Sequence, residues 1–202
     1  MSIFPLWIVA FISLQLVAGT DGPPPTPKTV EEAVAQYADV STPGWIAWTL
    51  FASGILVLTS VAALWLGWAV RGLRGGGIAA WLGTAAVVAG VLDSIVTIYV
   101  TIGLKLSDPP SYPPLIEQFA LGVESSKAWA NPLICGLFTA TVAVVAAIVW
   151  REKVLGRSAL VIAVLGGVFT VLTIVIPVPL FAAILLLVLG VVLLRSRKPG
   201  SA

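Results

Sequence analysis

Long apolar runs separated by short polar segments dominate the hydrophobic pattern of this sequence. Five of them occupy about residues 45–70, 78–104, 131–150, 158–176 and 179–194. A helix rises about 1.5 Å per residue, so about 20 apolar residues are enough to cross a bilayer. A transmembrane barrel strand would alternate apolar and polar residues, whereas these runs are continuously apolar. The pattern therefore predicts an all-α integral membrane protein, a polytopic helical bundle over residues 45–195.

The first apolar run, residues 1–19, is shorter and admits two interpretations. Val17 and Gly19 are small enough for a signal-peptide cleavage site. However, the only positive charge ahead of the run is the terminal amine. We therefore favour a short first transmembrane helix that is retained, which gives the bundle five to six transmembrane helices.

Two longer polar segments, residues 20–44 and 105–128, are rich in proline, and each is expected to carry a short surface helix. In the first segment, Thr29 and Glu32 have the spacing of a capping box. In the second, residues 115–129 are amphipathic. Asn131–Pro132 then has the pattern of a helix start, a capping residue followed by proline at the first helical position.

The apolar run from Ser158 to Leu194 is too long for one crossing. As a single helix it would measure about 55 Å, nearly twice a hydrocarbon core of about 30 Å. Pro177 and Pro179 mark the predicted break, because proline interrupts a helix. Two helices are therefore expected here, with Ser158 as the N-cap of the first, and residues 196–202 form a basic tail.

The distribution of charge predicts the orientation. Only 10% of the residues are charged, whereas soluble domains have about 25%. The segments 71–77, 151–157 and 195–202 carry eight cations, against three in the segments 20–44 and 105–128. Cations stay on the cytoplasmic side during insertion. We therefore expect a cytoplasmic C-terminus and extracytoplasmic segments 20–44 and 105–128, in the plasma membrane of a prokaryote. The eight tryptophans all fall near predicted span ends, as interfacial indoles do.

The residue types present restrict the chemistry. The chain has no histidine and a single cysteine, Cys135, so neither an internal disulfide nor a His/Cys metal cluster can form. We expect no enzymatic activity, no cofactor and no metal site, and we expect Cys135 to be a buried, inert thiol. The basic loops follow from topology, with anionic lipid headgroups as their expected ligand and no nucleic acid.

Asp93 is the only charged residue in the run 78–104. Together with Ser94, Thr97 and Thr101 it forms a candidate intramembrane polar site, because these residues recur at helical spacing on one face. An ionisable residue at mid-membrane is a functional candidate as an ion ligand or proton carrier. The other interpretation, which we favour, is a protonated carboxyl that hydrogen-bonds a neighbouring helix.

Small residues at four-residue spacing provide candidate helix-packing positions, namely Ala86, Gly90, Ala163 and Gly167. Such positions let transmembrane helices approach closely, within the bundle or against another protein. We expect membrane lipids and either other subunits or further copies of the chain as partners. The favoured function is a non-catalytic helical subunit of a larger membrane protein complex, with an accessory role in, for example, a respiratory or transport assembly. The alternative is a small oligomeric transporter or channel that uses Asp93.

Overall fold

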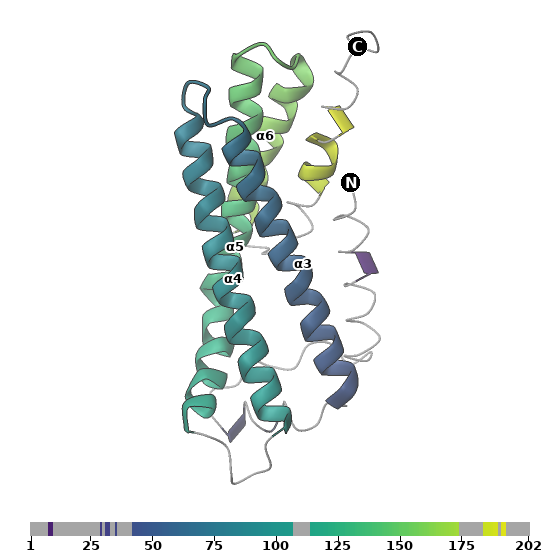
Figure 1. Ribbon diagram of the computed structural model, residues 1–202, viewed down its shortest axis with the longest axis vertical. Coiled ribbons are helices and arrows are strands. Elements are labelled where there is room, and N and C mark those ends of the chain that lie inside the picture. The colour runs from purple at the N-terminus through teal and green to yellow at the C-terminus, as the bar shows by residue number, and fades with distance from the viewer. Residues whose placement is uncertain are drawn as a thin grey trace.

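Four helices account for most of the described part of the chain in the computed structural model (Figure 1). They are α3 (Thr42–Ala69), α4 (Gly76–Leu106), α5 (Pro114–Arg151) and α6 (Arg157–Leu172). The described residues are 42–106, 114–173, 184–189 and 191–192, preceded by positions 8, 9, 29, 31, 32 and 35. No strand occurs among these residues, so the all-α fold class is confirmed.

Of the four described helices, three are long and apolar enough to cross a membrane, which supports a membrane location. The candidate spans are Ile46–Ala69, Gly76–Gly103 and Pro132–Arg151, and their bounds lie close to the first three predicted runs. Helix α6 is apolar but has 16 residues, fewer than the usual crossing of about 20. The predicted first helix and the predicted break at Pro177–Pro179 lie outside the described residues, so the count of five to six spans stays a prediction.

Helix α5 corrects the expected start at Asn131–Pro132 and the expected separate surface helix over residues 115–129. It has 38 residues and continues through Pro132. A proline removes one backbone hydrogen bond, but transmembrane helices tolerate it because their neighbours and local adjustments compensate. The proline at a first helical position is instead Pro114. An N–H group at that position would have no partner within the helix, so its absence costs nothing.

The α3–α4 turn and the α5–α6 turn lie at the same end of the bundle (Figure 1). An Nη2 group of Arg151 donates a hydrogen bond to the carbonyl oxygen of Arg74, which joins the two turns. The two basic loops that the charge pattern assigned to one side therefore do share one end of the molecule. Which side of a membrane this end faces stays a prediction.

Backbone hydrogen bonds at the end of α5 determine where α6 begins. The Val154 N–H donates to the Val149 oxygen at 3.0 Å, and the Lys153 N–H donates to the Trp150 oxygen at 3.0 Å. With Lys153 at φ 57°, this is a Schellman ending of the helix.

The expected N-cap at Ser158 is wrong, because Gly156 holds that position without any side-chain hydrogen bond. The side chain of Leu155 is buried in the core and fixes the chain reversal, so α6 begins at Arg157.

The main hydrophobic core lies in the half of the bundle next to the two turns. It joins α4, α5 and α6 with residues 185 and 189, and Leu66 of α3 packs against it. Its buried residues are Val70, Ala79, Val142, Val145, Ala146, Ile148, Val149, Leu155, Ala159, Ile162, Leu185 and Leu189. A smaller cluster continues it along α3, α4 and α5, with Ala63, Ala86, Ile134 and Phe138. Most of these side chains are small or β-branched, as expected where helices must approach closely.

The Thr29 hydroxyl accepts a hydrogen bond from the Glu32 N–H at 3.2 Å, the first of the two bonds that the capping-box spacing predicts. A backbone hydrogen bond and, second, a hydrogen bond to Thr29 lower the pKa of Glu31 from its usual 4.5. The charged carboxylate therefore favours the folded segment.

The pH dependence of this segment follows from the lowered pKa of Glu31. Its stabilising effect is fully present above pH 4.5 and is lost as the pH falls through the lower pKa of the folded state. In an NMR titration of the full chain in nanodiscs, Thr29→Ala should move the Glu31 pKa back toward 4.5. Thr29→Ser, which keeps the hydroxyl, is the control, and an unchanged pKa in Thr29→Ala would contradict the assigned cause.

Candidate functional site

Helices α3 and α4 touch backbone to backbone in the half near their turn. A Cβ atom at Gly83 of α4 would lie 2.7 Å from the carbonyl oxygen of Ala63. Gly67 of α3 packs even more tightly on the carbonyl oxygen of Ala79, and no side chain fits at either glycine. Glycine is required at these positions by close approach, which is how transmembrane helices gain packing energy in lipid.

The predicted packing residues Ala86 and Gly90 lie farther along α4, where three helices meet. Both are buried. Gly90 packs against the Ser60 hydroxyl of α3, and a Cβ there would lie 3.8 Å from the Phe138 ring of α5. These two positions therefore face protein and bring α3, α4 and α5 together.

The contact between α5 and α6 uses a different glycine from the one the spacing predicts. A Cβ at Gly167 would meet nothing within 4 Å, whereas a Cβ at Gly166 would lie 2.8 Å from the Cβ of Ala143. Ala163 is partly buried against the main core, as its place in the stripe requires. Residues three and four positions after Ala163 both lie near its face of the helix. The four-residue spacing selected Gly167, but the residue in contact is Gly166, three positions on.

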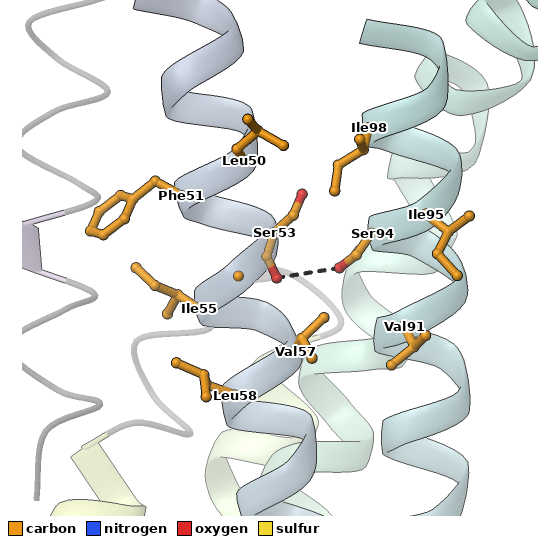
Figure 2. Close-up of a pocket in the computed structure, with 11 residues that line it drawn as sticks. Leu50, Phe51, Ser53, Ile55, Val57, Leu58, Val91, Ser94, Ile95 and Ile98 are labelled. Atoms are coloured by element: carbon orange, nitrogen blue, oxygen red, sulfur yellow. Dashed lines mark hydrogen bonds between the residues drawn. The ribbon is translucent and has the colours of Figure 1, made fainter. Parts of the chain in front are cut away.

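The polar stripe on α4 is turned toward the bundle. Ser94 and Thr101 are 3% and 2% exposed, and Thr97 is partly buried. The Ser94 hydroxyl donates to the Gly90 oxygen at 2.7 Å and lies 3.5 Å from the Ser53 oxygen of α3. The dashed line in Figure 2 marks this contact between the helices.

Asp93 lies at the edge of this stripe and is partly buried. Its carboxyl lies within electrostatic range of the Cys135 thiol on α5, and Cys135 is a buried free thiol, as the sequence predicts. Among the described residues, no group of three or more His, Cys, Asp or Glu side chains is placed to hold a metal ion. Helical spacing predicted Asp93 beside Ser94 and Thr97, but no sequence pattern indicated its interaction with Cys135.

Buried hydroxyl groups in the bundle mostly bond within their own helix. Each of the following donates to a carbonyl oxygen one turn earlier, at 2.6 to 3.0 Å: Thr59, Ser60, Thr139, Thr141 and Thr170. The hydroxyl oxygens of Thr170 on α6 and Thr139 on α5 also lie 3.0 Å apart, which is a polar contact between the two helices. Because these groups are satisfied by protein, they need no water in the bundle interior.

An open groove of about 610 Å³ lies between α3 and α4 in the half away from their turn (Figure 2). Figure 1 shows α3 leaning away from α4 toward the end at which α3 begins. The groove is lined by Leu50, Phe51, Ser53, Gly54, Ile55, Val57, Leu58, Val91, Ser94, Ile95 and Ile98. The groove was not predicted from the sequence, although the small pair Ser53–Gly54 in a mostly apolar stretch was a signal for it.

Small residues lie inside the groove, and large aliphatic side chains form its rim. A Cβ at Gly54 would meet nothing within 4 Å, so open space lies in front of it. Ser53 is 6% exposed, and its hydroxyl points into the space between α3 and α4 (Figure 2). In the described part of the chain this hydroxyl has no hydrogen-bond partner. Three aliphatic side chains at the rim, Leu50, Leu58 and Ile95, are about half exposed.

No protein-family model, no curated protein and no solved structure matches this chain. The described part of the chain is all-α and contains three candidate membrane spans. Its two distinctive features are the α3–α4 groove and the polar stripe beside it.

Gly83 lies in the backbone contact between α3 and α4, whereas Gly167 faces open space on α6. The same substitution should therefore have different effects at the two glycines. Gly83→Ala should destabilise the bundle by about 1–3 kcal/mol, because the added methyl group meets the Ala63 carbonyl. Gly167→Ala, on an open face of α6, should be neutral or stabilising by up to about 1 kcal/mol. Denaturant titration in mild detergent, followed by tryptophan fluorescence, measures both. Equal effects of the two substitutions would contradict the packing described here.

Proposed function

We propose that this protein is a non-catalytic, membrane-spanning subunit of a larger membrane protein complex. The observation that carries the proposal is the α3–α4 groove, which we infer to receive an apolar transmembrane helix of a different protein. A partner helix would cover Leu50, Leu58 and Ile95, which are about half exposed without it.

The shape of the groove favours a helix. Ser53, Gly54 and Ser94 are small, and large aliphatic side chains stand on both sides of them. Small residues beneath a groove let a second helix backbone come close, which is the main source of helix association in lipid. The groove extends over residues 50–58 of α3 and 91–98 of α4, about two helical turns or roughly 12 Å.

The buried hydroxyl of Ser53 favours protein over a lipid tail as the occupant. Ser53 lies about 10 Å below the start of the span at Ile46, within the depth of the hydrocarbon. Acyl chains at that depth offer no hydrogen-bond partner, and a buried hydroxyl without one is costly. A side chain or carbonyl oxygen on a neighbouring helix would supply it.

The bonding of the other hydroxyls supports an assembly role over transport. Hydroxyl groups that line a hydrated pathway need to face water, whereas those of Thr59, Ser60 and Thr139 bond to carbonyl oxygens of their own helices. Asp93 is the one acid in its span. A proton relay would therefore need acceptors from another chain.

Extraction of the native complex tests this function. We expect native mass spectrometry after gentle detergent extraction to find this chain in a stoichiometric complex with a different membrane protein. Gly54→Leu fills the groove and should lower partner occupancy at least about fivefold.

Gly167→Leu is the matched control, because Gly167 also faces open space but lies on α6; it should leave occupancy unchanged. A homogeneous homo-oligomer with nothing else bound would overturn the proposal in favour of the transporter alternative. Unchanged occupancy in Gly54→Leu would overturn the groove as the docking site.

A test of Asp93 distinguishes the assembly function from the transport alternative. The chain reconstituted into vesicles is expected to pass neither protons nor cations. Asp93→Asn should change the stability by less than about 1 kcal/mol, because the amide retains a hydrogen-bond donor and interhelical hydrogen bonds average about 0.6 kcal/mol. Flux assays and detergent unfolding measure the two quantities. A flux that Asp93→Asn abolishes while assembly is normal would contradict the packing role.

A further inference from the structure

The end of the bundle that carries the two turns is strongly basic. Five exposed cations lie on or beside the turns, namely Arg71, Arg74, Arg151, Lys153 and Arg157. The same two turns contain one carboxylate, that of Glu152. In the sequence these cations belong to loops about 80 positions apart, and the fold brings them to one place.

Arg151 joins the two turns, and its guanidinium group is occupied by protein partners. Its guanidinium donates to the Arg74 carbonyl oxygen and pairs with Glu152 at 3.1 Å. A Cβ at Gly75 would lie 3.9 Å from this guanidinium, and Gly75 has a positive φ of 84°, which favours glycine. The other four cations have no carboxylate partner among the described residues, so their charge is available; they are Arg71, Arg74, Lys153 and Arg157.

Exposed tryptophans place this basic end at the level of lipid headgroups. Trp81 and Trp65 are 77% and 69% exposed, and Trp68 and Trp150 are also exposed. Exposed indoles near the ends of apolar helices lie at the headgroup region of a bilayer. The Arg71 guanidinium lies 4.6 Å from the centre of the Trp68 ring, a cation–π contact that holds Arg71 at that level.

We propose that the two turns together form a binding site for the phosphate of an anionic phospholipid. Arg71 and Arg74 of one turn and Lys153 and Arg157 of the other provide the positive charge, and guanidinium groups bind phosphate oxygens in pairs. The tryptophans around the turns contact the upper acyl region of the same lipid. The site is separate from the α3–α4 groove and does not depend on the proposed complex.

Quenching of tryptophan fluorescence by brominated lipid tests the site in the full chain. In nanodiscs, brominated phosphatidylglycerol should quench more strongly than brominated phosphatidylcholine at equal mole fraction. The preference is the affinity for phosphatidylglycerol relative to phosphatidylcholine. The double variant Arg71→Gln, Arg74→Gln should reduce it by roughly an order of magnitude, because each basic residue near a membrane surface adds its own attraction to anionic lipid. Higher salt should weaken the preference in the unaltered chain.

Lys105→Gln with Lys127→Gln is the matched control, since it removes two charges from the other polar segment. This variant should keep the full preference for phosphatidylglycerol. Equal quenching by the two lipids would overturn the proposal, and so would an equal loss of preference in both double variants. Displacement of the lipid by millimolar inorganic phosphate would also overturn it, because the site would then bind phosphate and not a lipid.

Discussion

The backbone contact between α3 and α4 at Gly67 and Gly83 is the constraint on which the rest of the bundle depends. Lipid provides no hydrophobic force that would press two apolar helices together, so association requires close packing. At these two glycines a helix backbone lies directly on a carbonyl oxygen of its neighbour. With the helices held together at that end and tilted relative to each other, their other ends must separate (Figure 1), and the groove of about 610 Å³ is the result.

The bundle therefore has two halves with different properties. Near the turns, the main core joins α4, α5 and α6 through residues such as Val142 and Ile162. In the other half, the Ser94 hydroxyl of α4 contacts the Ser53 carbonyl oxygen of α3 beside the groove. The half near the turns is therefore closely packed, whereas the other half carries the groove to which we assign the proposed partner helix.

Regular features of the fold were predictable from sequence, and features that depend on contact were not. Continuous apolar runs predicted α3 and α4 closely, because hydrophobic length alone sets a span. The passage of α5 through Pro132 was not predictable, since local rules favour a helix start at Asn131–Pro132 and tertiary packing overrides them. The contact of α5 with Gly166 in place of Gly167, and the existence of the groove, both depend on how the helices are tilted. Residue spacing does not encode helix tilt.

Helix α5 has one further consequence for how the molecule responds to force. It is about 57 Å long, and Pro132 lies where its apolar span begins. Because the proline lacks an amide hydrogen, the helix is most easily bent at this joint. A pull on the arm that precedes the joint is thus absorbed by bending there, and the tightly packed half beyond it keeps its shape.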